Sequence, residues 1–147
     1  IHYSTRRRLP PELEEGAVFH AEPDEMLPLA DFLSLHAPAT PETNGWLDAR
    51  RIALLPPHSI VINTARGSLV DDEALIAALV SGRVRAAGLD VFNGEPALDP
   101  RYRPLLNTFL LPHIGTATIE TRTAMGFRAL DNLDAFFAGT APPDRVV

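Results

Sequence analysis

Three side chains that could together bind and protonate a keto acid, Arg66, Glu95 and His113, each follow a short apolar run of the chain. An arginine guanidinium pairs with a carboxylate through two parallel hydrogen bonds. A histidine can give a proton to a developing alkoxide near neutral pH, and a glutamate on its other ring nitrogen would fix the ring and favour the imidazolium. This combination indicates reduction of a 2-oxo acid: Arg66 holds the carboxylate, His113 protonates the oxygen, and a bound nicotinamide supplies hydride.

Taken alone, each of these residues has an ordinary structural interpretation. An arginine after a strand is usually a surface residue, and a Pro-His pair is usually a turn. Asp90 differs because it stands in an apolar run, where a buried carboxylate needs a partner. Gly67, Gly94 and Gly115 flank the candidates, which fits close approach to a ligand as well as tight turns. The combination favours an active site over separate surface features.

The elements that must position these residues are short apolar runs alternating with helical stretches. Strands are expected over 1–3, 17–19, 31–36, 59–63, 86–91 and 108–111, and helices over 25–30, 48–55, 71–81 and 119–138. Strands that alternate with helices form β-α-β units and a parallel sheet, so we predict an α/β fold, a Rossmann-like doubly wound parallel sheet. Ligands bind beyond the carboxyl ends of strands in such sheets, so the strand ends should converge on one site.

Composition restricts the class of protein. Hydrophobic residues make up 46% and charged residues 22% of the 147 residues, as in an ordinary globular domain. There is no cysteine, which excludes disulfides, cysteine-zinc sites and thiol nucleophiles and is compatible with a cytoplasmic location; we predict no metal site. The net charge of −6 and pI near 5.3 argue against a nucleic-acid partner. No apolar run approaches the ~18 residues that a membrane span needs.

Three segments resemble the D-isomer-specific 2-hydroxyacid dehydrogenases: INTARGSLVDDEALIAAL at 62–79, AAGLDVFNGEP at 86–96 and LPHIGTATIETR at 111–122. The glyoxylate/hydroxypyruvate reductase branch is the most similar. The resemblance implies that Arg66 binds the substrate, His113 is the general acid/base and Glu95 is its acidic partner. The residues that it implies for the cofactor are Ala37, Pro38, Thr64, Ala65, Asp90, which would hold the nicotinamide carboxamide, and Gly115.

The resemblance also implies that the chain is incomplete. It opens on Ile1 without an initiating methionine, and the glycine-rich loop of the first β-α unit does not precede it. We therefore expect a partial nucleotide-binding (Rossmann) domain over 1–118, and a C-terminal helix and tail over 119–147 that would return to a missing substrate domain. The whole protein is expected to be a homodimer, and the fragment alone to be inactive.

The end of the first strand bears on the cofactor. In a complete Rossmann fold this would be the second strand, which commonly ends in an acidic residue that binds the ribose 2′-hydroxyl of NAD, whereas arginine accommodates the 2′-phosphate of NADP. The strand end here carries Ser4, Thr5, Arg6 and Arg7, with no acid. Hydroxyl and guanidinium groups suit a phosphate dianion, so we predict NADP(H) over NAD(H). A solvated basic turn is the alternative.

Other functions stay open at this stage. A 3-phosphoglycerate dehydrogenase would have the same chemistry with another small 2-oxo/2-hydroxy acid as substrate. A dinucleotide-binding corepressor of the same superfamily can retain the arginine, glutamate and histidine, so these residues do not separate it from an enzyme. An inactive remnant is the third alternative.

Overall fold

The computed structural model describes residues 1–146, and their contacts divide the chain into two compact units. The first unit, Ile1–His113, holds the sheets, and the second, from Ile114 onward, holds the long helix α5 (Ile119–Phe137). We predicted a domain boundary after residue 118. The contacts divide between His113 and Ile114, and the return of the C-terminal part to a substrate domain stays a prediction.

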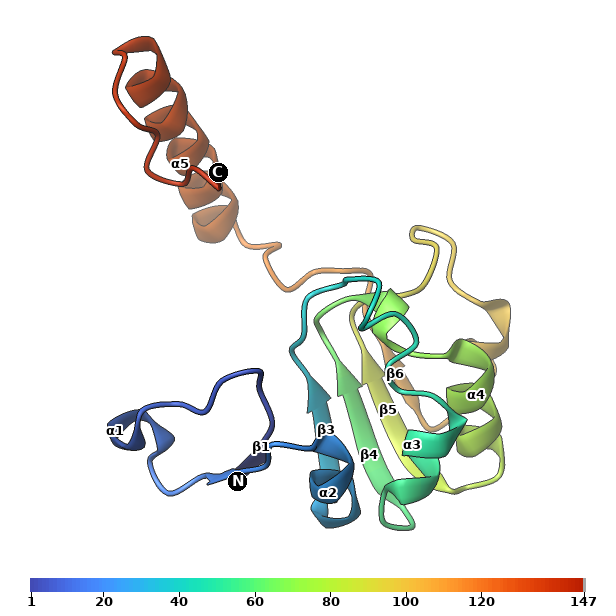
Figure 1. Ribbon diagram of the computed structural model, residues 1–147. Coiled ribbons are helices and arrows are strands. Elements are labelled where there is room, and N and C mark those ends of the chain that lie inside the picture. Colours follow the sequence, from blue (N-terminus) through green and yellow to red (C-terminus); the bar gives the residue numbers. More distant parts are fainter. Residues whose placement is uncertain (147) are drawn as a thin grey trace. The chain divides into compact units, whose positions relative to one another are not determined.

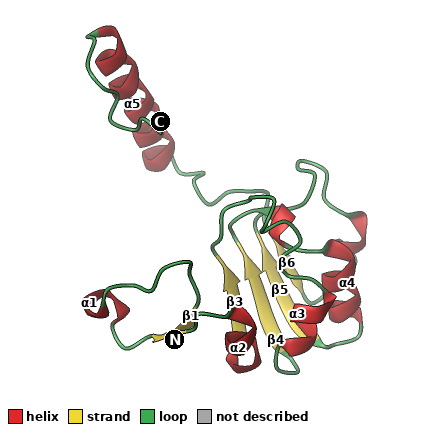
Figure 2. Ribbon diagram, in the orientation of Figure 1, coloured by secondary structure: helices red, strands yellow, loops and turns green. Residues whose placement is uncertain are grey.

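The sheet of the first unit has four parallel strands in the order β3 (Phe32–Leu35), β4 (Ser59–Asn63), β5 (Val84–Leu89) and β6 (Thr108–Leu110) (Figures 1 and 2). A doubly wound sheet is built in both directions from its first strand. The four strands here follow one another in one direction, so they make one half of such a sheet. The predicted α/β architecture is confirmed, in its incomplete form.

A second, two-stranded sheet pairs β1 (His2–Tyr3) with β2 (Val18–Phe19) in parallel. The short helix α1 (Pro11–Glu14) lies between them and was not predicted. Its first residue is a proline, which suits the first turn of a helix because its fixed φ is already helical and no amide hydrogen is needed there. Four residues are too few to produce a periodic pattern in the sequence.

The helix predicted over 25–30 is displaced toward the N-terminus. Helix α2 spans Pro23–Met26 and continues as a 3₁₀ turn over Leu27–Leu29. Pro23 takes the favoured first position. Pro28 lacks the amide hydrogen that an α-helix would need at that point, so the chain tightens there.

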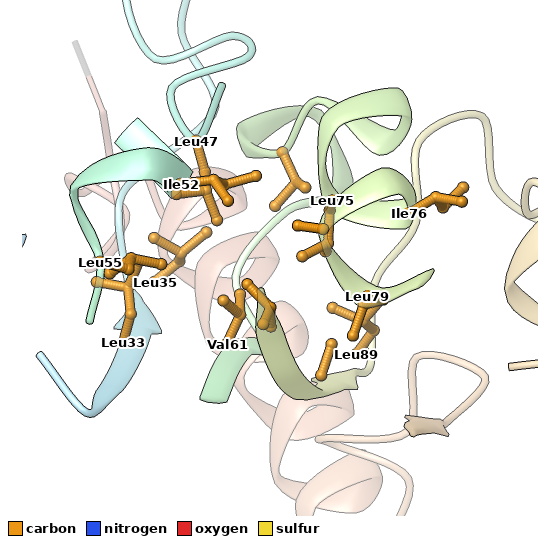
Figure 3. Packing of buried hydrophobic residues seen from close by; sticks show 14 of the residues in the cluster. Leu33, Leu35, Leu47, Ile52, Leu55, Val61, Leu75, Ile76, Leu79 and Leu89 are labelled. Carbon is orange, nitrogen blue, oxygen red and sulfur yellow. The ribbon is translucent and has the colours of Figure 1, made fainter. Parts of the chain in front are cut away.

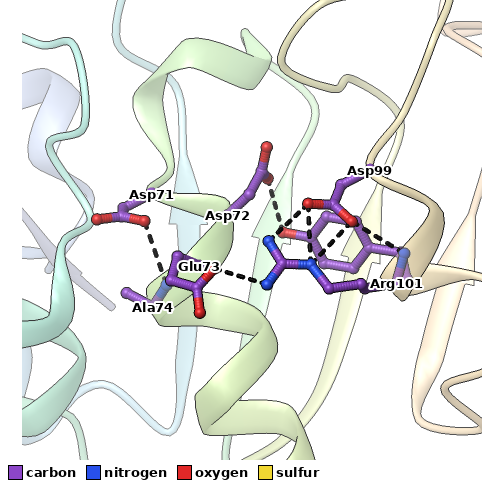
Figure 4. Close-up of polar contacts among 7 residues, drawn as sticks. Asp71, Asp72, Glu73, Ala74, Asp99 and Arg101 are labelled. Carbon is purple, nitrogen blue, oxygen red and sulfur yellow. Dashed lines mark hydrogen bonds and ion pairs between the residues drawn. The ribbon is translucent and has the colours of Figure 1, made fainter.

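The helices that cover the sheet begin at aspartates. Helix α3 (Ala49–Leu54) has Asp48 as its N-cap, as predicted, and the Asp48 carboxylate accepts a hydrogen bond of 2.8 Å from the Arg51 amide. Helix α4 (Asp72–Val80) is capped by Asp71, which accepts from the Ala74 amide at 3.2 Å (Figure 4). Such caps satisfy amide hydrogens that have no partner inside the helix.

A polar cluster fixes the loop after β5 to the start of α4 (Figure 4). The hydroxyl of Tyr102, which is 1% exposed, donates to Asp72 at 2.7 Å. Burial raises the pKa of Tyr102 and also that of the Asp72 carboxyl. Arg101 forms ion pairs with Asp99 at 2.7 Å and with Glu73 at 2.6 Å.

One face of the sheet forms the core. Alternate side chains of the strands point to this face, among them Leu33, Leu35, Val61 and Leu89. They pack in one cluster with Ile52 of α3 and with Leu75, Ile76 and Leu79 of α4 (Figure 3). The burial of the side chains of β3 and β4 follows the period of two that is expected of strands. On the opposite face Phe32 and Phe109 stay 68% and 67% exposed.

Two loops at the carboxyl edge of this sheet meet backbone to backbone. Gly67, just after β4, is buried, and a Cβ added to it would overlap the carbonyl of Phe92 and the amide nitrogen of Asn93. Its φ is not in the left-handed region. The glycine is therefore required for space. No other residue lets the turn after β4 lie this close to the turn after β5.

We expect Gly67→Ala to lower the free energy of unfolding by about 2 kcal/mol or more, because overpacked sites cost about 1–3 kcal/mol and backbone atoms cannot rotate away. Urea unfolding measures the change. Gly88→Ala is the matched control, since a Cβ at Gly88 in β5 meets nothing within 4 Å. Equal stability of the two variants would contradict the close approach.

Candidate functional site

The three candidate residues follow neighbouring strands at the same edge of the sheet. Arg66 follows β4, Glu95 follows β5 and His113 follows β6, and the three strands are parallel neighbours. Their carboxyl ends therefore lie along one edge, as predicted. Pairing continues beyond the strands, where the Asp90 amide donates to the Asn63 carbonyl at 3.0 Å.

The turn that carries Arg66 is held by Asn63, the last residue of β4. The buried Asn63 side chain donates to the Arg66 carbonyl at 2.9 Å and accepts from the Ala65 amide at 3.1 Å. The Arg66 guanidinium is exposed and donates to the Ala65 carbonyl at 2.6 Å. Sequence reasoning missed Asn63, although a buried amide that ends an apolar strand was a usable signal.

Glu95 and His113 are in direct contact. The Glu95 Oε2 atom lies 2.7 Å from His113 Nδ1, and Glu95 Oε1 accepts from the Phe92 amide at 2.8 Å. With an ionised carboxylate the shared hydrogen belongs to Nδ1, so Nε2 is the ring nitrogen left for proton exchange. The contact with His113 first, and the Phe92 amide second, lower the pKa of the Glu95 carboxyl.

The backbone of His113 is in the left-handed region, with φ of 55°. Few residues other than glycine adopt this conformation, though asparagine, aspartate and histidine do so more often than most. Such backbone conformations cluster at functional sites, where the surrounding structure compensates their cost. A turn is the ordinary interpretation of the Pro112-His113 pair, but its left-handed backbone was not predicted.

Asp90 is buried, at 5% exposure, and lies just beyond β5. We expected it inside a strand over 86–91, but β5 begins at Val84 and ends at Leu89. The early start escaped prediction because Arg85 makes the segment look polar, while its neighbour Val84 is fully buried. Asp90 therefore belongs to the carboxyl edge, and its charge opposes the lowering of the Glu95 pKa.

A hollow of about 550 Å³ lies beside Arg66. It is lined by His36, Ala37, Pro38, Ala39, Ala65 and Arg66. Three of the predicted cofactor residues are thus beside the predicted substrate arginine. His36 was not predicted; it lies just after β3, and its Nε2 is 2.8 Å from the Ser34 hydroxyl. Thr64 is exposed on the same turn as Ala65.

The basic loop, residues 4–9, leaves β1 as expected. Ser4 is half-buried, while Thr5, Arg6 and Arg7 are exposed, and the Thr5 hydroxyl donates to the Arg7 carbonyl. Over residues 1–146 no hydrogen bond or ion pair joins this loop to the hollow. The strand end itself carries no acid, but the fold brings Glu14 of α1 to this loop.

The remaining candidate, Gly115, lies in the second unit, and its place beside a cofactor stays a prediction. Across the described part of the chain, no group of three or more histidine, aspartate or glutamate side chains could hold a metal ion. None of the described helices combines the length and apolarity that crossing a membrane requires.

Comparison with known proteins places these residues in one family. Residues 1–115 match the family described as D-isomer specific 2-hydroxyacid dehydrogenase, NAD binding domain. Glycerate dehydrogenase of Hyphomicrobium methylovorum is 49% identical over 128 residues, which cover 87% of this chain and 40% of that protein.

Two solved structures are similar in both sequence and fold. Glyoxylate reductase from Paecilomyes thermophila has a TM-score of 0.86 and 40% identity, over 91% of this chain and 40% of that one. The NADPH-dependent glyoxylate/hydroxypyruvate reductase of Sinorhizobium meliloti, in complex with NADP and malonate, has a TM-score of 0.87 and 36% identity, over 92% and 42%. The chain spans less than half the length of these relatives.

The contact between Glu95 and His113 makes a prediction for titration. The Glu95 pKa should lie below that of an ordinary glutamate, and His113→Asn should raise it, because the imidazole is the main cause of the shift. The carboxyl ¹³C resonance measures this, with His58→Asn as control, another exposed histidine with positive φ. No difference between the two variants would contradict the contact.

The same shift has a consequence for stability. A lowered carboxyl pKa in the folded state stabilises the fold above the unfolded pKa, and this contribution is lost as pH falls through the folded value. The difference in the free energy of unfolding between the native protein and Glu95→Gln should therefore decrease as the pH falls through the folded-state pKa of Glu95.

Proposed function

Because this chain belongs to the D-isomer specific 2-hydroxyacid dehydrogenase family, through its NAD-binding domain, we propose that the protein that contains it reduces a small 2-oxo acid to the D-2-hydroxy acid. Glyoxylate and hydroxypyruvate are the proposed substrates. The observation that carries the proposal is the Glu95–His113 pair, at the same sheet edge as Arg66. Relatives that reduce glyoxylate support the substrate class.

The hollow beside Arg66 suits part of a dinucleotide. Ligand sites are concave and mostly apolar with a few polar groups, of about 300–1,000 Å³. Ala37, Pro38 and Ala65 provide small apolar walls, and the hollow lies at the carboxyl edge of a parallel sheet. Asp90 and Thr64 would hold polar groups of the cofactor nearby. When bound, the nicotinamide supplies the hydride.

The residues of this chain would do the rest of the chemistry. Arg66 is exposed and would exchange its contact with the Ala65 carbonyl for a bidentate contact with the substrate carboxylate. His113 would give the Nε2 proton to the substrate oxygen as hydride reaches the carbonyl carbon, which yields a neutral alcohol. Glu95 would hold the ring and stabilise the imidazolium before the transfer.

We expect His113→Asn to lower kcat for glyoxylate by on the order of 10²-fold or more, since positioned proton transfer contributes about that much. Asparagine tolerates the left-handed backbone, so the turn should survive. Consumption of NADPH by the full-length protein measures the rate. His58→Asn, with a φ of 66°, should keep native activity, and a near-normal kcat for His113→Asn would remove His113 from the mechanism.

Activity of the unaltered full-length protein tests the proposal as a whole. Tight dinucleotide binding without turnover of glyoxylate or hydroxypyruvate would favour a corepressor. Turnover of a phosphorylated 2-hydroxy acid instead would favour a 3-phosphoglycerate dehydrogenase. The cytoplasmic location and the homodimer stay predictions.

The basic loop supports NADP(H) as the preferred cofactor, with NAD(H) as the alternative. Arg6 and Arg7 are exposed, and over residues 1–146 no acidic side chain pairs with either of them. Ser4 and Thr5 would add hydroxyl groups. The NADPH-dependent relative from Sinorhizobium meliloti supports the same assignment.

We expect Arg6→Ala with Arg7→Ala to weaken NADPH binding by about 10-fold or more, because charge-assisted contacts to the 2′-phosphate contribute about 1.5–3 kcal/mol each. NADH binding should change little, since NADH has no such phosphate. Fluorescence titration of the full-length protein measures both dissociation constants. Equal losses for the two cofactors would make the loop a solvated turn.

A further inference from the structure

One carboxylate is bound inside the basic loop. Glu14 of α1 accepts hydrogen bonds from Arg8 Nε at 2.7 Å and Arg8 Nη2 at 2.9 Å, and also one from the Tyr3 hydroxyl. Its side chain is only 10% exposed, whereas that of Arg8 is 62% exposed. The two parallel contacts with the guanidinium fix its plane as well as its position.

Tyr3 fixes the far end of the same loop. Its hydroxyl accepts from the Leu9 amide at 3.2 Å while it donates to Glu14, so both ends of the loop are attached to one carboxylate–phenol pair. The Tyr3 ring lies 5.3 Å from that of Phe19 in β2, and the Arg8 guanidinium lies 5.9 Å from the Phe19 ring centre. Residues 4–7 therefore lie between Tyr3 and Arg8, and both of these side chains are held by Glu14.

The three arginines of the loop therefore differ in their contacts. Arg8 forms an ion pair with Glu14 and lies over the Phe19 ring. Arg6 and Arg7 are exposed and make no ion pair over residues 1–146. The guanidinium of Arg8 lowers the Glu14 pKa to about 2, with a smaller contribution from Tyr3, so the carboxylate is charged and matched by Arg8 at neutral pH. The Glu14 carboxylate therefore faces a neighbouring phosphate as a paired charge.

We propose that Tyr3, Arg8 and Glu14 form a brace that positions Arg6 and Arg7 for the 2′-phosphate of NADP, so that Arg8 and Glu14 determine cofactor specificity without touching the cofactor. This inference rests on the proposed NADP preference. A loop that is already ordered loses less conformational freedom when it binds its ligand, and the gain appears as affinity. Arg8 and Glu14 are positioning residues in this scheme.

The double variant Arg8→Ala with Glu14→Ala tests the brace, because it removes one positive and one negative charge together. The net charge near the phosphate is unchanged, so any loss of NADPH affinity reports lost positioning. We expect the dissociation constant for NADPH to rise about 10-fold and that for NADH to change less than about 2-fold, as NADH lacks the phosphate that the brace serves.

The matched control is Arg128→Ala with Asp144→Ala, an exposed ion pair of the second unit with a separation of 2.6 Å between Nε and Oδ2. Both cofactors should bind this control as they bind the native protein. Arg8→Lys retains a charge but not the fork, and an intermediate rise of about 3-fold for NADPH alone is expected. This variant decides the question if the double variant does not fold.

The outcomes separate the brace from the proposed cofactor. If the native protein binds NADPH no better than NADH, both the preference and the brace are overturned. If Arg6 and Arg7 matter but the charge-neutral double variant and Arg8→Lys keep native selectivity, the brace alone is overturned. An equal loss of affinity for NADPH and NADH would also overturn the brace, because Tyr3, Arg8 and Glu14 would then have a purely structural role.

Discussion

The backbone of Gly67 lies against the backbone of Phe92 and Asn93, and the geometry of the candidate site depends on this approach. Arg66 precedes the glycine, and the Phe92 amide binds the carboxylate of Glu95, which in turn binds His113. The turns after three strands are therefore connected through a few short contacts. A side chain at position 67 would separate the guanidinium from the imidazole and its partner.

Two exposed regions use a carboxylate in the same way. Glu95 and Glu14 each bind a basic side chain and a second donor, a backbone amide in one case and a phenol in the other. A carboxylate with two donors has little rotational freedom, so the basic group that it holds is also directed. In both regions the carboxylate and its basic partner are separated in sequence, by 6 positions for Arg8 and Glu14 and by 18 for Glu95 and His113, and folding brings them together.

The strands and the carboxyl edge could be predicted because their signals are local. The β-branched run of β4 was predicted to the residue at both ends, and the aspartate before α3 caps it as expected. The chemistry of Glu95 and His113 suggested their contact, and the expected convergence of the strand ends made it possible. The three segments that resemble the family contain the same residues.

What escaped prediction depends on contacts between distant residues. Nothing in the sequence near Tyr3 indicates that its hydroxyl contacts Glu14. Helix α1 has only four residues, which are too few to give a periodic pattern. Asn63 holds the turn that carries Arg66, but this contact can be predicted only when the buried face of β4 is known. The close packing at Gly67 could have been suspected only as one use of a glycine among several.

The left-handed backbone at His113 restricts what could replace this residue during evolution or engineering. A β-branched or bulky side chain would add roughly 1–2 kcal/mol of local strain before its chemistry was considered. Of the residues that tolerate such a turn, only histidine both exchanges protons near neutral pH and is large enough to reach beyond the rim. Other proton donors, such as lysine or tyrosine, would need a redesigned turn first.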